Sequence, residues 1–332
     1  MIGTELKRTY RVVEPLGEGG MGAVYVAEHV KLPRRFAVKF LARLDKATPE
    51  LLKRFEREAL ITSGLGHPNI VEVIDFDHLA DDTPYIIMEL LQGQDLAQRL
   101  TSGGPLGPDA LAPVARQLCA ALAAAHDAEV VHRDLKPQNI FLHQWGGAEV
   151  VKVLDFGISK IRQGDTQLTA DQAVMGTAHY MAPEQAQGAG SVDARADLFA
   201  LGAILYECVT GKLAFPGSTL AEVVHAVCYG PRPSLREARP DLPAALDQAV
   251  SRLLSVDPDA RYTDVGAAWR ELAPALGAPT SLVDTDAPGL AATQAAAALT
   301  TDAEGTADTV ASQTGMAPDG LPTRSILIKL RQ

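Results

Sequence analysis

Cysteine is scarce in this chain of 332 residues, which contains only three. The three are odd in number and include no Cys-x-x-Cys pair, so they give no sign of paired-thiol chemistry. Cys119, Cys208 and Cys228 each lie in an apolar, helix-like stretch. We expect them to be reduced core residues rather than reactive thiols.

Long apolar runs are also missing. No run approaches the roughly 18 residues that would indicate a membrane-spanning helix. The N-terminus lacks the charged-then-apolar pattern of a signal peptide. The sequence therefore predicts a cytoplasmic protein without a membrane span.

Positive charge is in deficit, because 30 Lys and Arg residues stand against 41 Asp and Glu residues, a formal net charge of −11. The field of such a chain repels phosphate backbones and anionic lipid surfaces. Nucleic acid is therefore not expected among its partners. Hydrophobic residues make up 47% and charged residues 21% of the chain, and these shares are ordinary for a folded protein.

Two regions of different patterning follow one another. Short runs that alternate apolar and polar residues, such as Phe36 to Leu41, dominate between Tyr10 and Leu90 and are typical of strands. One stretch in this region, Pro49 to Gly64, instead has its apolar residues near helical spacing after a Thr-Pro start signal. The N-terminal part is thus predicted to be β-rich with one main helix.

After Gly93 the pattern becomes mainly helical. Asp109 to Asp127 and Ala196 to Thr210 are long helical stretches, and Gly211 supplies a stop signal for the second. Residues 130–157 contain short β-type runs around polar turns, of which Val150 to Leu154 is the clearest. The fold class predicted from both regions is α+β.

The composition changes again beyond Ala275. Ala, Thr, Asp, Gly and Pro dominate, and no basic residue occurs between Ala273 and Thr323. We expect residues 276–332 to be a disordered tail. Ile326 to Arg331 regain apolar character but are too few to form a domain, and a frayed end is favoured over docking.

A glycine-rich segment precedes one of the predicted strands. Gly17, Gly19 and Gly22 stand at the first, third and sixth positions of Gly17-Glu18-Gly19-Gly20-Met21-Gly22, and Val24 follows. Glycine lets the backbone pass close to phosphate oxygens and present its N–H groups. A dinucleotide-binding unit needs a helix directly after the glycines. Because a strand follows here, a phosphate-covering loop between two strands is favoured; a plain glycine hairpin is the alternative.

Lys39 ends an alternating strand, where it could project a cation toward phosphates or simply be solvated. Glu58 follows on the one predicted helix of this region, where a carboxylate can hold the Lys39 ammonium. Glu56 is the competing acid on the same helix, and its different helical face makes Glu58 the preferred partner.

The segment His132-Arg133-Asp134-Leu135-Lys136-Pro137-Gln138-Asn139, called the catalytic loop below, brings an acid, a cation and an amide within six positions. Asp155-Phe156-Gly157 follows a short predicted hairpin. Phosphoryl transfer requires an oriented alcohol, cations for the developing charge, and hard oxygen ligands for a metal ion. Asp134, Lys136, Asn139 and Asp155 supply these groups.

These motifs, taken in order, resemble those of the eukaryotic-type protein Ser/Thr kinase family, and their residue sequences are most similar to those of its bacterial members. The resemblance implies a two-lobed protein kinase domain over residues 7–275, with an N-lobe over about 7–90 and a C-lobe over about 91–275. It implies ATP as the phosphate donor, Mg²⁺ or alternatively Mn²⁺ as the metal, and Ser or Thr hydroxyls of proteins as acceptors.

The resemblance also assigns roles. Asp134 would be the base for the substrate hydroxyl, Lys136 would neutralise the transferring phosphate, and Lys39, anchored by Glu58, would contact the α and β phosphates. Asn139 and Asp155 would hold the metal. The nucleotide would lie against Leu16, Gly17, Glu18, Gly19, Gly20, Met21, Gly22, Val24, Ala37, Lys39, Met88, Glu89, Leu91 and Phe141. Phe141 stands where the family usually has an aliphatic residue, which narrows the adenine pocket.

Further roles implied by the resemblance concern scaffold and regulation. Met175 to Glu184 is similar to the end of an activation segment, with Thr177 near the acceptor site. Glu184 would form a structural ion pair with Arg261, and Asp197 would brace the backbone of the catalytic loop. Arg133 would receive a phosphate from the activation segment, for which the acceptor residues are Thr166 and Thr169.

Autophosphorylation there implies self-association of two copies, and an unregulated loop is the alternative. Two other functions are weighed against a protein kinase. A pseudokinase scaffold would lack one of the chemical groups, yet none is missing. A small-molecule kinase of the same fold would not need the peptide-docking stretch between Gly176 and Glu184.

Overall fold

The structure, a computed structural model, describes residues 1–19, 22–41, 49–156, 176–188 and 192–282. Several sequence-based expectations lie outside the described residues, namely those for Gly20, Met21, Gly157, Thr166, Thr169, Met175 and residues 283–332 of the tail. Among the described helices, none is both long and apolar enough to cross a bilayer.

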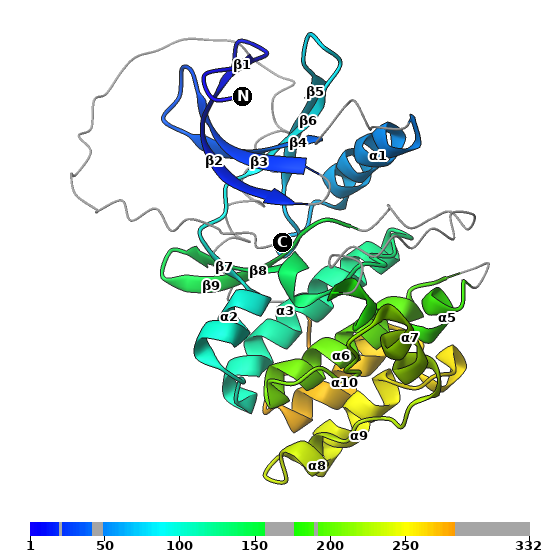
Figure 1. Cartoon of the computed structure of the whole chain (residues 1–332). Coiled ribbons are helices and arrows are strands. Elements are labelled where there is room, and N and C mark those ends of the chain that lie inside the picture. Colours follow the sequence, from blue (N-terminus) through cyan, green and yellow to red (C-terminus); the bar gives the residue numbers. More distant parts are fainter. Residues whose placement is uncertain (20–21, 42–48, 157–175, 189–191, 283–332) are drawn as a thin grey trace, which may run out of the picture. The chain divides into compact units, whose positions relative to one another are not determined.

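A six-stranded antiparallel sheet forms the N-terminal part, in the order β1-β2-β3-β4-β6-β5 (Figure 1). Its strands are β1 (Glu5–Leu6), β2 (Tyr10–Gly19), β3 (Gly22–His29), β4 (Arg35–Leu41), β5 (Val73–His78) and β6 (Pro84–Glu89).

Alternation along β4 decides which of its side chains face the sheet's own core. Phe36, Val38 and Phe40 belong to one apolar cluster. Because neighbouring side chains of a strand point to opposite faces, Ala37 and Lys39 lie on the other face of the sheet. That other face borders the candidate site described below.

The predicted helix is present as α1 (Pro49–Leu65), and it packs against β5 and β6. Phe55 and Ala59 on α1 form a second apolar cluster with Leu41 and Ile86 of the sheet. This packing fixes α1 beside β4, so that a polar side chain on its site-facing side can reach the sheet.

The C-terminal part is mainly helical, as predicted, and also carries a small antiparallel sheet in the order β7-β8-β9. The strands are β7 (Gly93–Asp95), β8 (Ile140–Trp145) and β9 (Ala148–Val153). The helices are α2 (Leu96–Gly103), α3 (Pro108–Asp127), α5 (Pro183–Ala186), α6 (Arg195–Thr210), α7 (Leu220–Tyr229), α8 (Leu235–Ala238), α9 (Ala244–Leu253) and α10 (Val265–Ala275), with 3₁₀ turns η2 (Pro137–Asn139) and η4 (Pro258–Ala260).

Helix α6 lies at the centre of this part, where it contacts α3, α8 and α9 (Figure 1). Nearly all of its residues are buried, from Ala196 to Tyr206 and again at Cys208 and Val209. Gly211 ends the helix in the left-handed conformation with φ 68°, which confirms the predicted stop. Cys119, Cys208 and Cys228 are all buried and reduced, as expected.

Short helix α5 is held in place by a buried ion pair. The Arg261 guanidinium donates to both carboxylate oxygens of Glu184 at 2.8 Å, which confirms the predicted pairing. It also donates to the carbonyls of Ser255, Arg195 and Val256, and its side chain is fully buried. One side chain therefore connects α5, the start of α6 and the segment before η4.

We predict that Arg261→Met lowers the free energy of unfolding by about 3–5 kcal/mol, because it leaves the Glu184 carboxylate partly buried without its cation. Urea unfolding followed by circular dichroism measures the loss. Arg270→Met on the exposed face of α10 is the matched control, and it should stay within about 0.5 kcal/mol of the wild type. Equal stability of the two variants would contradict the importance of the pair.

Candidate active site

A cavity of about 200 Å³, open to solvent, lies where the N-terminal sheet and α1 meet the β7-β8-β9 sheet. Its walls include all of the predicted pocket side chains outside the glycine-rich segment, namely Leu16, Val24, Ala37, Lys39, Met88, Glu89, Leu91 and Phe141. Other residues that line it were not predicted from the sequence as pocket residues, among them Thr62, Val73, Asp95, Gln138 and Leu154. Strands and a helix distant in sequence therefore share one pocket.

Strand register explains how the upper wall is assembled. Val24 on β3 pairs with Lys39 on β4, and Ala37 on β4 pairs with Met88 on β6. Directly paired residues in antiparallel strands place their side chains on the same face. Two apolar side chains, one cation and one thioether therefore border the cavity together.

The glycine-rich segment is a hairpin between two strands, as the sequence indicated. Gly17, Glu18 and Gly19 belong to β2 and Gly22 begins β3, with Gly17 paired to Val24 and Gly19 paired to Gly22. No helix follows the glycines, since the chain continues along β3. The hairpin brings the backbone of β2 and β3 to the edge of the cavity, where Leu16 and Val24 line it.

Lys39 forms ion pairs with one carboxylate of the N-terminal part and one of the C-terminal part of the molecule. Its Nζ lies 2.9 Å from Glu58 Oε1 on α1 and 2.7 Å from Asp155 Oδ1, which follows β9. The side chains of Lys39 and Glu58 are 9% and 14% exposed, whereas that of Asp155 is 52% exposed and can reach a bound molecule. The expected partner of Lys39 is therefore Glu58 and not Glu56.

Burial and charge act against each other in this cluster. Burial disfavours the charged form of Lys39, but the carboxylates of Asp155 and Glu58 outweigh it and raise the pKa of the lysine. Burial, reinforced by the Asp155 charge, raises the pKa of Glu58 to about 7. Partial desolvation opposes ionisation of Asp155, although its side chain is half exposed, but the Lys39 cation prevails and lowers its pKa. Asp155 is therefore the carboxylate held ionised at the cavity.

The catalytic loop places an acid, a cation and an amide in direct contact. Lys136 Nζ lies 3.0 Å from Asp134 Oδ2 and donates to Thr177 Oγ1 at 2.9 Å. Asn139 Nδ2 donates to the backbone carbonyl of Asp134 at 2.9 Å, and Asn139 also lines the cavity beside Asp155. Asp134, Lys136, Asn139 and Thr177 thus converge next to the cavity, as the sequence predicted for one site.

The backbone of the catalytic loop is bound to the buried carboxylate of Asp197. Asp197 Oδ2 accepts from the His132 N–H, and Oδ1 accepts from the Arg133 N–H, both at 2.8 Å. The sequence predicted this contact. It missed His126, whose Nε2 lies 2.8 Å from Asp197 Oδ2, because nothing local marks a histidine at the end of α3 as part of the site.

A second missed residue is Lys152 on β9. Its Nζ lies 2.6 Å from Glu89 Oε1, and the same oxygen accepts from the Glu72 N–H at 2.9 Å. A lysine inside the otherwise apolar run from Val150 to Leu154 was the available signal. The pair ties the segment from Glu89 to Leu91, which connects the two parts of the molecule, to the β8-β9 hairpin that carries Phe141.

Comparison with known proteins identifies the architecture. The model of the protein kinase domain matches residues 10–272. The serine/threonine-protein kinase Pkn1 of Myxococcus xanthus is 45% identical over 260 residues, which cover 78% of this chain and 37% of that protein. The serine/threonine-protein kinase PrkC of Bacillus subtilis is 36% identical over 263 residues, which cover 79% of this chain and 40% of PrkC.

A solved structure agrees with the fold. The kinase domain of PknI from Mycobacterium tuberculosis superposes with a TM-score of 0.63 at 30% identity, covering 83% of this chain and 98% of that one. This chain spans well under half the length of Pkn1 and PrkC. Because the family model matches far more than half of the chain, the chain belongs to the protein kinase domain family, with bacterial serine/threonine-protein kinases among its relatives.

Proposed function

We propose that this protein transfers the γ-phosphate of ATP to Ser or Thr hydroxyls of protein substrates. One observation carries the proposal: the Lys136 ammonium contacts the Asp134 carboxylate and the hydroxyl of Thr177, beside the cavity that holds Lys39 and Asp155. A base, a cation and an alcohol thus lie next to a pocket in which the Lys39 ammonium stabilises the Asp155 carboxylate. The kinase domain proposed for this activity spans residues 7–275, divided near Leu90.

The cavity supports the proposed nucleotide site. Adenine would lie between Ala37 and Val24 on one side and Phe141 on the other, near the backbone of Glu89 to Leu91. Phe141 is almost fully buried in the floor. Lys39 would contact the α and β phosphates while Glu58 anchors its ammonium. The glycines at 17, 19 and 22 would cover the phosphates with backbone N–H groups.

We propose Mg²⁺ as the metal, held by Asn139 and Asp155. The donor set fits a hard cation, because the Asp155 carboxylate is held ionised and half exposed beside Asn139. The Asn139 amide nitrogen is engaged by the Asp134 carbonyl, which orients its oxygen away from that contact. When bound, the metal would neutralise phosphate charge.

Asp134 is the proposed base and Lys136 the proposed stabiliser of the transferring phosphate. The substrate oxygen would form a bond to the γ-phosphorus while the bond between that phosphorus and the β,γ-bridging oxygen breaks. ADP leaves, and the hydroxyl proton passes to the Asp134 carboxylate. The Lys136 ammonium, 3.0 Å from Asp134 Oδ2, would stabilise both the carboxylate and the phosphoryl oxygens.

Asp134→Asn should lower phosphate transfer from radiolabelled ATP to a generic protein acceptor by about 10²- to 10⁴-fold, because the amide cannot take the hydroxyl proton. Asp127→Asn, the same change at an exposed position at the end of α3, is the control and should label like the wild type. Equal labelling by Asp134→Asn and the wild type would refute the assigned base. Absence of labelling by the wild type would instead favour a pseudokinase.

Lys39→Met should abolish labelling while the chain still folds, because the lost ammonium positions the phosphates. A fluorescent ATP analogue reports nucleotide binding, and a thermal unfolding scan reports folding. Lys31→Met, at an exposed position between β3 and β4, is the matched control. Retained transfer by a folded Lys39→Met variant would contradict the proposed role of the lysine.

We further propose that autophosphorylation raises activity. Thr166 and Thr169, the proposed acceptors, lie outside the described residues. Arg133 is the proposed receiver of this phosphate. Among the described residues, its guanidinium donates to a neutral group, the carbonyl of Val192 at 3.1 Å. A phosphate would give it a stronger, charge-assisted partner.

Mass spectrometry of the active enzyme should therefore find phosphate on Thr166 or Thr169, and phosphatase treatment should lower its activity. The double variant with Ala at both positions should behave like the phosphatase-treated protein. Full activity with both threonines unmodified would contradict this regulation. Thr177, whose hydroxyl accepts from Lys136 at 2.9 Å, is the third proposed regulatory residue, and the same spectra report whether it carries phosphate.

A further inference from the structure

Asp134 extends from a strained stretch of backbone. Arg133, the residue before it, has φ 65°, in the left-handed region that residues with a Cβ rarely adopt. A residue with a Cβ keeps this backbone conformation only where surrounding contacts hold it. On the N–H side, Asp197 accepts from Arg133 at 2.8 Å.

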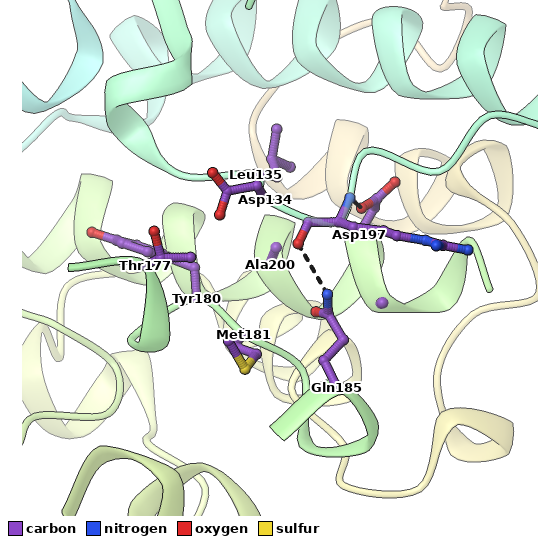
Figure 2. A pocket seen from close by; sticks show the side chains of 10 residues that line it. Asp134, Leu135, Thr177, Tyr180, Met181, Gln185, Asp197 and Ala200 are labelled. Atoms are coloured by element: carbon purple, nitrogen blue, oxygen red, sulfur yellow. Dashed lines mark hydrogen bonds between the residues drawn. The ribbon is translucent and has the colours of Figure 1, made fainter. Parts of the chain in front are cut away.

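The carbonyl side of Arg133 has its own partner, Gln185 of α5. Gln185 Nε2 donates to the Arg133 carbonyl oxygen at 2.9 Å, and Figure 2 draws this bond as the dashed line that starts at the Gln185 nitrogen. That carbonyl belongs to the peptide bond between Arg133 and Asp134. Because a peptide unit is planar, the direction of its C=O also fixes the direction in which the chain enters Asp134.

The donor is itself held from two directions. Gln185 Oε1 accepts from the Ala182 N–H at 3.1 Å and so caps the N-terminus of α5. The preceding residue, Glu184, accepts two hydrogen bonds from the buried Arg261 guanidinium, one on each carboxylate oxygen and both at 2.8 Å. The Gln185 amide is therefore a planar bridge between a fixed helix end and the strained peptide of the catalytic loop.

We propose that Gln185 is a positioning residue for the phosphoryl transfer reaction, acting by holding the Arg133–Asp134 peptide so that the Asp134 carboxylate meets the acceptor hydroxyl. This inference rests on the proposed role of Asp134. Asp197 and Gln185 hold the two sides of Arg133, and Figure 2 shows both side chains reaching toward this stretch of backbone. Gln185 does not line the nucleotide cavity, so we expect its substitution to leave nucleotide binding unchanged.

The chemistry of the amide suggests a sharp test. A glutamate at position 185 can still accept from the Ala182 N–H, since either Glu or Gln serves in a capping box. An ionised carboxylate has no donor for the Arg133 carbonyl, so Gln185→Glu keeps the helix cap, removes the bridge and places a negative charge beside that carbonyl. Gln185→Met has a similar length and no charge, and it removes both contacts.

The experiment compares steady-state transfer to a generic protein acceptor by the wild type, Gln185→Glu, Gln185→Met and the control Gln187→Glu. Gln187 is exposed and lies two positions along the same segment, so its variant adds the same charge without touching Arg133. Losing a hydrogen bond to a partly buried carbonyl should lower kcat about tenfold in both position-185 variants. The KM for ATP should stay within about twofold, as expected when binding is untouched.

Thermal unfolding separates positioning from simple stability. Gln185→Met, which also loses the cap, should unfold at a lower temperature than Gln185→Glu, while both show the same loss of kcat. Wild-type kcat in Gln185→Glu, or an equal loss in Gln187→Glu, would overturn the inference and leave the proposed kinase function intact. Absence of transfer by the wild type would refute the proposed function and, with it, the role of Gln185.

Discussion

The geometry of the catalytic loop depends on the buried carboxylate of Asp197. Its side chain is 1% exposed, and an ionised carboxylate in such surroundings is stable only when its oxygens accept hydrogen bonds. The N–H groups of His132 and Arg133 and the ring of His126 meet this requirement. Because α6 is buried along nearly its whole length, the carboxylate extends from a tightly packed helix, and the backbone of the loop is bound to it.

Three further polar bridges extend this framework to the rest of the site. Arg261 fixes α5 through Glu184, and Gln185 then reaches from α5 to the Arg133 carbonyl. Lys39 contacts both Glu58 on α1 and Asp155 after β9. It therefore connects the N-terminal sheet and its helix to the C-terminal part of the molecule. In each case a side chain with several donors connects elements that are distant in sequence, where apolar packing alone would leave orientation undetermined.

The contacts of Lys39 also explain why its two carboxylate partners differ in pKa. Lys39 stands between two carboxylates, and burial acts more strongly on Glu58 than the lysine can offset, so that its pKa rises to about 7. Asp155 is more exposed and remains ionised. A metal ion or phosphate entering the cavity would therefore meet one fixed anion and one fixed cation, a preorganised arrangement that does not have to be formed during the reaction.

The sequence by itself determined the fold class, the glycine hairpin between two strands, and the identity of the groups that converge: Lys39, Glu58, Asp134, Asn139 and Asp155. It could do so because strand alternation, helical spacing and motif order are local properties of the chain. The pairing of Glu184 with Arg261 and of Asp197 with the catalytic loop came from resemblance to a family. Both contacts are present.

Only the tertiary structure decided the contacts of His126, Lys152 and Gln185. Gln185 lies 52 positions from Arg133, and His126 lies 71 positions from Asp197. A glutamine within a short helix, or a histidine at the end of a long one, has no pattern that indicates a distant backbone carbonyl or carboxylate as its partner. Such pairs arise from the packing of α3, α5 and α6 around the loop, and packing is a property of the whole fold rather than of any segment.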